Sequence, residues 1–457
     1  MIVMKFGGTS VESAAAIERV ASIVQARLDR KPVVVVSAMG KTTNKLLAIA
    51  ALAAEGKSAQ AQESLDELKD FHLRESAALA RDEERPELHG RIENEFRLLC
   101  QALSEIESQG EVTPALTDSV SSFGERLSSL MTAYAFRKFG METAHVDSRD
   151  VIVTDSRYTQ AQPLYAATYS RLRKTIPPLT EAGQVVVMGG FIASNQNGQT
   201  TTLGRGGSDF TAAIVGAGID AAEIQIWTDV DGMLTCDPRV LPGGHRVKRI
   251  SFAEAAELAY FGAKVLHPST VLPAIDRNIP VLILNSRRPE VGGTLITSDP
   301  VACANPFKSI ACKQGITLLN IVSTRMLMAH GFLRRIFEVF DRYETPVDMI
   351  ATSEVSVSLT IDNRRHLEPI CEELRRIAEV TVEEHLAIVC MVGENIRNRP
   401  GIAARVFGAL SPITVRMISQ GASLVNLSLV VSADQLATAI EALHQEFFDE
   451  LDPAVFE

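Results

Sequence analysis

The sequence predicts an α/β protein, in which a mainly parallel sheet sandwiched by helices is followed by two smaller ferredoxin-like βαββαβ units. The first observation is that residues 1–300 alternate short β-rich runs with longer helical patterns. These runs are continuously apolar, as in strands that are covered on both faces. The second is that the elements after Gly292-Gly293 recur weakly with a period of about 70 residues in the order β-α-β-β-α. The third is size: 457 residues with 46% hydrophobic content allow two or three domains of roughly 150 residues each.

Local composition predicts the individual elements. Apolar, β-branched runs predict strands in the first part of the chain, at 32–37, 184–190, 224–228 and 280–285. Residues 45–140 are helical and rich in charge, which predicts a solvated helical lobe. The first small unit is predicted at 315–323, 333–343, 347–350, 355–361 and 367–377, and the second at 387–392, 402–410, 415–418, 424–431 and 435–447.

These elements place the predicted domains at 1–300, 310–382 and 383–457. The tail 449–457 is too short to add a strong strand to the last domain. An exchange of strands between the two small units therefore stays open beside the prediction of two independent units.

Composition limits the classes of function. The formal net charge of −11 argues against nucleic acid and anionic membranes as partners, and requires that positive charge be concentrated locally to hold anionic substrates. No apolar run approaches the ~18 residues of a membrane span, and the N-terminus lacks the features of a signal peptide, so we expect a cytoplasmic protein. The six cysteines form no CxxC pair and the nine histidines show no metal-ligand spacing, which predicts free thiols and no metal held by the protein alone.

A glycine loop at Leu203–Asp209 carries the strongest chemical signal. Its three glycines leave backbone N–H groups that can approach an anion, and Arg205 offers a bidentate fork for a carboxylate or phosphate. Ser208-Asp209 can start the helix that follows, and a helix N-terminus favours negative charge. A tight structural turn is the alternative interpretation.

A second loop of this kind stands at the N-terminus. Lys5 ends a short apolar strand, Gly7 and Gly8 turn the chain, and Thr9 or Ser10 can cap the next helix. Two phosphate-type loops about 190 residues apart suggest one nucleoside triphosphate site assembled from both halves of a domain. Gly-Lys-Thr at 40–42 lacks the first glycine of a Walker A loop, and the glycines at 216–221 trail a helix rather than open one, so neither a P-loop nor a dinucleotide fold is supported.

Five segments occur in an informative order: Lys5–Ser10, Thr201–Asp209, Trp227–Gly232, Asp237–Arg239 and Phe261–Pro268. Together they resemble the signature runs of the aspartate kinase family, and the repeated C-terminal units resemble its paired ACT domains. The resemblance spans the whole chain and is to the monofunctional, lysine-sensitive type. It implies the amino-acid kinase fold and transfer of the γ-phosphoryl of ATP to the side-chain carboxylate of L-aspartate, giving 4-phospho-L-aspartate for lysine, threonine and methionine synthesis.

The resemblance also implies roles for single residues. The nucleophile is already an anion at neutral pH, so catalysis should consist of positioning and charge neutralisation. Lys5 and Asp209 are the expected catalytic residues, and Mg²⁺ is expected to bind with ATP, mainly through phosphates and waters. The expected aspartate-binding residues are Ser37, Thr43, Glu125, Arg205 and Ser208. The expected ATP-binding residues are Lys5, Gly7, Gly8, Thr9, Gly206, Gly207, Thr228, Asp229, Leu234, Arg239, Lys264 and Val265.

Some of these residues have a plainer interpretation. Without the resemblance, Glu125 and Arg126 are a helical ion pair on a solvated face, and Lys264 is a surface lysine lying beside Phe261. Leu234 stands where the family usually has tyrosine, so it can pack a purine or ribose but offers no aromatic face.

The ACT units are expected to bind an amino-acid effector and to form a homodimer, with a tetramer left open. Asp348 and Glu354 suit a ligand with two ammonium groups, because buried charge needs a partner, and this favours lysine. Ala329 stands where lysine-sensitive relatives tend to carry a hydroxyl, so threonine is the second choice, and an ACT pair that only dimerises is the alternative. The expected effector residues are Met326, Ala329, Phe332, Leu333, Val347, Asp348, Ser353 and Glu354.

Two other functions compete with this one. One is another kinase of the same fold acting on glutamate, acetylglutamate or a nucleoside monophosphate; the full Lys5–Thr9 motif and the repeated tail weigh against it. The other is a catalytically silent amino-acid sensor, against which the clustered charges of Lys5, Arg205 and Asp209 argue.

Overall fold

The chain was analysed as a computed structural model that describes residues 1–262, 268–299, 302–323 and 330–457. It divides into two compact units, Met1–Gly232 with Val265–Ser298, and Met233–Lys264 with Asp299–Glu457. Residues 233–264 therefore group with the C-terminal part, although the predicted division at 300 kept them in the first domain. The physical reason is hydrogen bonding, since Ile310 N donates to Thr235 O (2.8 Å) and Ser309 Oγ donates to Leu234 O (2.6 Å).

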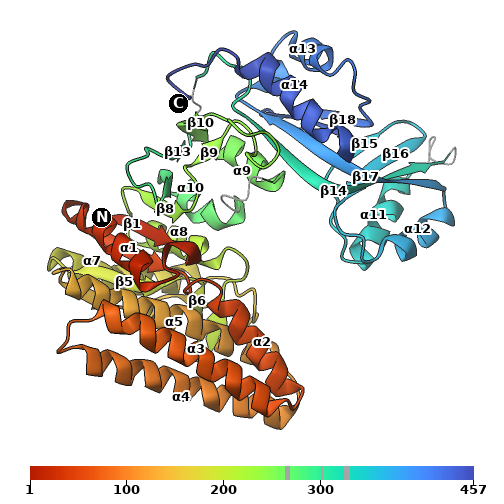
Figure 1. The fold of residues 1–457 in the computed structure, drawn as a ribbon. Coiled ribbons are helices and arrows are strands. Elements are labelled where there is room, and N and C mark those ends of the chain that lie inside the picture. Colours follow the sequence, from red (N-terminus) through yellow and green to blue (C-terminus); the bar gives the residue numbers. More distant parts are fainter. Residues whose placement is uncertain (263–267, 300–301, 324–329) are drawn as a thin grey trace. The chain divides into compact units, whose positions relative to one another are not determined.

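The first unit is built on the predicted, mainly parallel sheet, with strand order β13-β12-β8-β1-β2-β5-β3 (Figure 1). Every neighbouring pair in this order is parallel except the edge pair β12 and β13. All positions of β1 and β2 are buried, as expected for strands covered on both faces. The strands are β1 (Ile2–Phe6), β2 (Pro32–Val36), β3 (Thr143–His145), β5 (Val185–Gly189), β8 (Ile224–Thr228), β12 (Val281–Asn285) and β13 (Thr294–Thr297).

Helices flank this sheet, and the long helices α3, α4 and α5 run side by side as the predicted charge-rich lobe (Figure 1). α5 differs from its neighbours, because it is buried along most of its 25 residues and packs against β5. A small sheet of β4 (Val153–Thr154), β6 (Ile192–Asn195) and β7 (Thr200–Thr202) precedes α8. The helices are α1 (Ala14–Gln25), α2 (Thr42–Ala54), α3 (Ser58–Leu79), α4 (Arg85–Gln109), α5 (Pro114–Lys138), α6 (Ser148–Val151), α7 (Tyr165–Glu181), α8 (Gly207–Gly218) and α10 (Leu272–Asp276), with 3₁₀ turns η1 (Gly8–Ser10), η2 (Leu28–Arg30) and η3 (Pro268–Val271).

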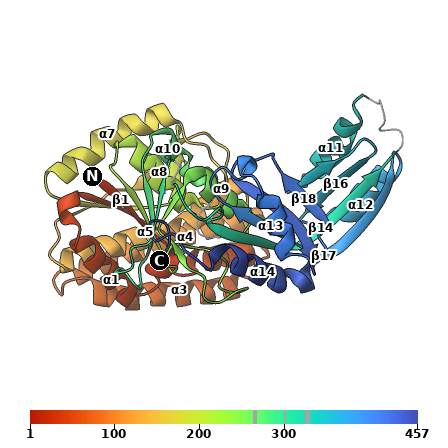
Figure 2. The same cartoon turned by 90° about the horizontal axis from the view of Figure 1, so that it is seen from above.

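The second unit contains an antiparallel sheet with strand order β15-β16-β14-β17-β19-β18. α11 and α12 lie beside one half of this sheet, and α13 and α14 beside the other (Figure 2). Its main strands are β14 (Ser309–Val322), β15 (Ile350–Thr352), β16 (Ser356–Ile361), β17 (Glu379–Val392), β18 (Met417–Gln420) and β19 (Asn426–Ser432). Its other elements are β9 (Met233–Leu234), β10 (Arg246–Val247), β11 (Arg249–Ser251), α9 (Phe252–Tyr260), α11 (Phe332–Arg342), α12 (Leu367–Arg375), α13 (Ile402–Ala409), α14 (Leu436–Phe448), η5 (Ile396–Asn398) and η6 (Ala433–Gln435).

The two halves of this sheet share their long strands. The C-terminal part of β14 pairs with β16, whereas its N-terminal part, 309–314, pairs with 387–392 of β17. Residues 387–392 also pair with β19. Residues 309–314 thus supply to the second half of the sheet the strand that its own C-terminal tail does not supply. The predicted boundary between the two ACT domains, at 383, falls inside β17. The tail instead binds β10, where Arg246 N donates to Glu457 O at 2.8 Å.

No helix within the described ranges has the length and apolar character needed to cross a membrane.

Candidate active site

The carboxyl ends of the parallel strands position the predicted site. Lys5 lies near the end of β1, in register with Val35 on β2 and Ile226 on β8. Ligands of open α/β sheets bind outside these carboxyl ends. The loops that follow β1, β2, β5 and β8 are therefore the segments from which a site can be assembled.

A pocket of about 270 Å³ lies among these loops. It collects residues that are up to 204 positions apart in the chain, and most of them are residues that the sequence singled out. The lining residues are Lys5, Ser37, Thr43, Glu125, Phe191, Gly204, Gly206, Gly207, Ser208 and Asp209. Lys5 of the first motif and the second glycine loop thus meet at one pocket, whereas Gly7 and Gly8 of the first loop do not line it.

Lys5 and Asp209 form an ion pair in this pocket. Lys5 Nζ lies 2.6 Å from Asp209 Oδ1, and the two side chains are only 11% and 16% exposed. The loop after β1 must remain free of side chains, because a Cβ on Gly8 would lie 3.1 Å from two carbonyl oxygens. A Cβ on Gly7 would lie 3.6 Å from Lys5 Nζ, so this glycine leaves space directly beside the ammonium.

The N-terminus of α8 opens onto the same pocket. α8 begins at Gly207, with Gly206 in the left-handed region (φ 72°) as the preceding residue and no side-chain cap. Ser208 and Asp209 therefore lie in the first turn rather than cap the helix as predicted, and their N–H groups belong to the set that no helical carbonyl can satisfy. Gly190 permits this arrangement, since a Cβ there would lie 2.6 Å from Ser208 Cβ. The helix start is a suitable place for a phosphate.

Glu125 enters the pocket from α5 and is 4% exposed. Ala38 N donates to its Oε1 at 3.1 Å, whereas its Oε2 has no hydrogen-bond partner among the described residues. Burial raises the pKa of Glu125 to about 8, against the lowering effects of the Ala38 hydrogen bond and the Lys5 charge. The solvated ion pair of Glu125 with Arg126 is therefore wrong. Arg126 instead contacts Glu95, with Arg126 Nη2 2.5 Å from Glu95 Oε2.

Asp118, about two turns earlier on α5, was not singled out by the sequence. Its Oδ2 accepts hydrogen bonds from Thr159 N (2.9 Å) and Thr202 N (3.0 Å), and its Oδ1 accepts from Thr202 Oγ1 (2.6 Å). Thr202 leads directly into the glycine loop, so this fully buried carboxylate fixes the loop to α5. Ser121, Ser122 and Glu125 share its helix face, so no local pattern in the sequence singled Asp118 out.

Other predicted residues of the first unit lie around the pocket without lining it. Arg205 is exposed between the lining residues Gly204 and Gly206, and makes no ion pair with any described carboxylate. Thr9 is exposed in η1. Thr228 and Asp229 follow β8, with Thr228 Oγ1 donating to Asp229 Oδ1 at 3.2 Å.

The remaining ATP-binding predictions fall elsewhere. Leu234 lies half-buried in β9 of the second unit. Arg239, also in that unit, is exposed and pairs with Asp237 at 2.6 Å. Lys264 and Val265 lie outside the described residues.

The predicted effector residues occupy different environments in the second unit. Phe332 is a core residue, whereas Leu333, Ser353 and Glu354 are exposed, and Val347 is half-buried. Met326 and Ala329 lie outside the ranges that the structure describes.

Asp348 is almost completely buried and already has a cationic partner. Lys313 Nζ lies 2.6 Å from Asp348 Oδ1 and 2.7 Å from Asp362 Oδ2, and Tyr260 OH donates to Asp348 Oδ1 at 3.4 Å. The Asp348 side chain is 3% exposed, and its Oδ2 lacks a hydrogen-bond partner in the described chain. Burial raises the pKa of Asp348, although the hydrogen bond from Lys313 opposes this effect.

Comparison with known proteins agrees with this geometry. Residues 1–285 match the amino acid kinase family, and residues 389–447 match the ACT domain. The chain is 39% identical over 469 residues to Arabidopsis thaliana aspartokinase 2, chloroplastic, a match that covers 99% of this chain and 85% of the relative.

Two solved structures of Escherichia coli aspartokinase III match the chain along its length. The complex with aspartate and ADP is 37% identical with a TM-score of 0.82, and the complex with lysine and aspartate is 38% identical with a TM-score of 0.83. Each match covers 98% of this chain and 100% of the solved chain. The chain therefore belongs to the amino acid kinase family and, within it, to the aspartokinases that carry ACT domains.

Proposed function

We propose that this aspartokinase transfers the γ-phosphoryl group of ATP to the side-chain carboxylate of L-aspartate in the pocket formed by Lys5, Glu125 and the start of α8. One observation carries the proposal: a partly buried ammonium, an orphaned buried carboxylate oxygen and a helix N-terminus line one small pocket. The carboxylate oxygen complements a substrate ammonium, and the Lys5 ammonium and the helix N-terminus complement phosphate groups.

Glu125 supports binding of the substrate ammonium. A buried carboxylate with one unsatisfied oxygen is stabilised by a cationic donor, and the ammonium of aspartate supplies one. Arg205 has no competing carboxylate among the residues that the structure describes and can close over the substrate α-carboxylate. Ser37, Thr43 and Ser208 would add hydrogen bonds from the pocket wall.

Lys5 and the N-terminus of α8 support phosphoryl transfer. An oxygen of the substrate side chain would form the new bond to the γ-phosphorus as the bond to the β-bridging oxygen breaks, and ADP would leave. No base is required, because the attacking carboxylate is already ionised. Lys5 would neutralise charge on the transferring group, and Asp209 would hold Lys5 in place through the 2.6 Å ion pair.

Mg²⁺ fits this arrangement as a companion of the nucleotide, since it prefers phosphate and water ligands with few carboxylates. The lining carboxylate available for it is Asp209. The nucleotide base would lie outside this pocket, next to Thr228 and Asp229 after β8.

An assay that traps the acyl phosphate as its hydroxamate tests the proposal. We expect Lys5→Ala to lower kcat by at least about a hundredfold, as for loss of one preorganised charge in a transition state, with little change in Tm. Lys174→Ala, which removes an exposed lysine from α7, is the matched control and should retain wild-type rates. Equal losses of kcat in both variants, or a loss of Tm that parallels the loss of kcat in Lys5→Ala, would refute the assignment of Lys5.

We further propose that the ACT units bind lysine and pair two copies of this chain as a homodimer in the cytoplasm. The buried, orphaned Oδ2 of Asp348 and the exposed carboxylate of Glu354 support a diamino acid as effector. The identity of the effector is tested by measuring initial rates of the wild type and of Glu354→Ala. Each protein is assayed with millimolar lysine and, separately, with millimolar threonine. Inhibition by threonine alone, or by neither, would refute lysine, and sedimentation at micromolar concentration tests the dimer.

A further inference from the structure

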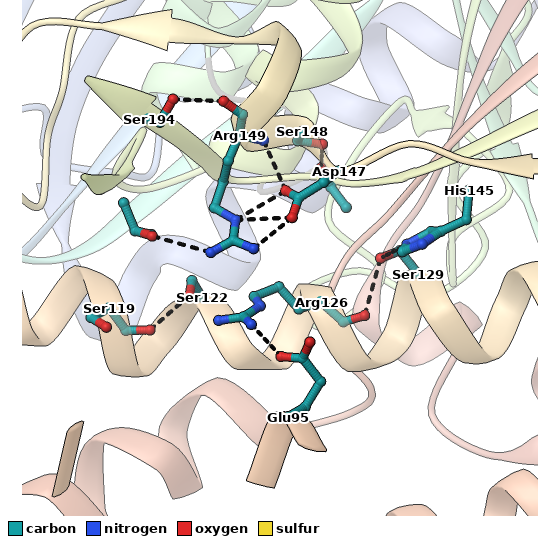
Figure 3. Close-up of polar contacts among 12 residues, drawn as sticks. Glu95, Ser119, Ser122, Arg126, Ser129, His145, Asp147, Ser148, Arg149 and Ser194 are labelled. Carbon is teal, nitrogen blue, oxygen red and sulfur yellow. Dashed lines mark hydrogen bonds and ion pairs between the residues drawn. The ribbon is translucent and has the colours of Figure 1, made fainter. Parts of the chain in front are cut away.

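A second polar cavity, of about 250 Å³, lies within the first unit and shares no lining residue with the pocket of Lys5. Side chains from several segments converge on it (Figure 3): Glu95 on α4, Arg126 and Ser129 on α5, His145 at the end of β3 and Asp147 directly before α6. Such convergence of charged groups around a hollow has no role in the phosphoryl transfer proposed above. The cavity therefore needs its own explanation.

The two carboxylates of the cavity are already paired. Asp147 accepts hydrogen bonds from Arg149 Nε at 3.0 and 3.1 Å and from Arg149 Nη2 at 2.5 Å (Figure 3). Glu95 Oε2 lies 2.5 Å from Arg126 Nη2. Arg91, a third arginine at the rim, makes no ion pair with any carboxylate of the described residues. Positive charge is therefore in excess.

Arg126 is a largely buried donor that keeps unused hydrogen-bonding capacity. Its side chain is 11% exposed, and a guanidinium carries five N–H donors, of which Glu95 engages only part. Its other neighbour is the ring of Phe123, with the guanidinium carbon 4.1 Å from the ring centroid. Burial lowers the pKa of Arg126, against the raising effect of the Glu95 charge.

His145 also lies near positive charge on the wall of this cavity. Its Nε2 lies 3.0 Å from Ser129 Oγ, so the ring and the hydroxyl face the cavity as a pair. Burial, followed by the nearby Arg91, lowers the pKa of His145 to about 4, and the ring is neutral at pH 7. An anion in the cavity would offset the effect of Arg91 and raise the pKa of His145.

We propose that this cavity binds a small oxyanion, a carboxylate or phosphate, held by the guanidinium of Arg126 and by Ser129 and His145. The volume admits a compact ligand and excludes a nucleotide, since pockets for drug-sized molecules start at about 300 Å³. The arginine fork suits both carboxylate and phosphate. Substrates and products of the reaction belong to this chemical class.

The cavity lies close to the aspartate pocket although it is separate from it. Glu125 and Arg126 are consecutive on α5 and face the two different hollows. Gly189 forms part of the wall, because it lines the cavity and a Cβ on it would lie 3.1 Å from Glu125 Cβ. An anion bound at Arg126 would thus lie one layer of backbone away from the carboxylate that we assign to the substrate ammonium.

His145 provides a local readout for the test. The full chain is labelled at the histidine ring carbons, and the His145 signal is assigned by its loss in His145→Gln. Saturating ADP and aspartate fill the other pocket. Inorganic phosphate and succinate are then titrated separately to about 10 mM, which saturates a site of sub-millimolar Kd. We expect a saturable shift of the His145 signal and a rise of its pKa by at least about one unit.

Arg126→Gln should weaken the response at least about tenfold, as for loss of a charged hydrogen bond. Arg97→Gln, which removes an exposed guanidinium from α4, is the matched control and should respond like the wild type. If Arg126→Gln does not fold, Ser129→Ala replaces it and should also weaken the response. A response to phosphate alone or to succinate alone identifies the source of the anion and supports the proposal. No shift of His145 with either probe, or an undiminished shift in the folded Arg126 and Ser129 variants, would overturn it.

Discussion

Glu125→Gln is the most informative substitution in the aspartate pocket. The structure raises the pKa of Glu125 from an ordinary value of 4.5 to about 8, mainly by burial. In the free enzyme only about a tenth of this carboxyl group is ionised at pH 7, and about nine tenths at pH 9. Because the substrate ammonium needs the ionised form, kcat/KM for aspartate should rise about tenfold between these values, and a plot against pH reports the free-enzyme pKa.

The substitution should remove this pH dependence and raise KM. Glutamine keeps an oxygen for the Ala38 N–H group but cannot pair with an ammonium, so KM for aspartate at pH 9 should increase by about ten- to a hundredfold, as for loss of a charged hydrogen bond. The hydroxamate assay at several aspartate concentrations from pH 6 to 9 measures both effects. A wild-type kcat/KM that is flat over this range, or a variant that keeps the rise, would refute the assignment of Glu125 to the ammonium.

The raised pKa of Glu125 also predicts that the folded protein becomes less stable as pH rises, although kcat/KM increases over the same range. The folded-state pKa of Glu125 lies above its unfolded value, so the folded protein binds the extra proton between pH 4.5 and about 8. Its contribution to the free energy of unfolding is therefore lost as pH rises through this window, by about 3 kcal/mol at pH 7. Glu125→Gln should unfold at higher denaturant concentration than the wild type at pH 8 and equally at pH 4.5. A variant that is less stable at pH 8 would contradict the raised pKa.

Three further substitutions test neighbouring features. Asp118→Ala should raise KM for aspartate more than it lowers kcat, because the glycine loop loses its anchor on α5. Steady-state kinetics measures both constants, and a variant with normal KM would exclude this role of Asp118. Lys308→Met should lower the free energy of unfolding by about 3–5 kcal/mol in denaturant titrations, because Glu254 is then left fully buried and unpaired; a loss below about 1 kcal/mol would contradict the burial. Lys313→Met should lower the lysine concentration for half-inhibition about tenfold, because the effector no longer competes for Asp348; unchanged inhibition would show that Asp348 does not contact the effector.

The fold of the first unit follows from its sequence because its signals are local. Apolar runs such as 32–37 predict strands buried on both faces, and the structure places them in the centre of a parallel sheet. The two glycine loops could also be recognised from the sequence, because backbone without side chains next to a helix N-terminus is suited to anion binding. Lys5 and the second glycine loop meet at one pocket because the carboxyl ends of parallel strands share an edge.

What the sequence could not predict depends on long-range contacts. Residues 233–264 look continuous with the kinase domain in sequence, but their hydrogen bonds go to β14. Strand sharing between β14 and β17 depends on register, which periodicity does not specify. Taken without the family resemblance, Glu125 and Arg126 are interpreted as a solvated ion pair, because adjacent charges on a helix usually face solvent. In the structure α5 is buried along most of its length, so this interpretation is wrong.

The burial of α5 explains why so much of the chemistry depends on one helix. A helix buried all round normally carries apolar side chains, yet α5 places Asp118, Glu125 and Arg126 in its buried stretch. Each of these charges opposes folding unless a partner compensates it, and each faces a different feature: the anchored glycine loop, the aspartate pocket and the oxyanion cavity. Within the described residues, hydrogen bonds engage both carboxylate oxygens of Asp118, whereas Glu125 Oε2 has no partner and Arg126 pairs with Glu95 alone. Ligands that compensate Glu125 and Arg126 should therefore each stabilise the folded protein, and their effects should be coupled because the two residues are neighbours on α5.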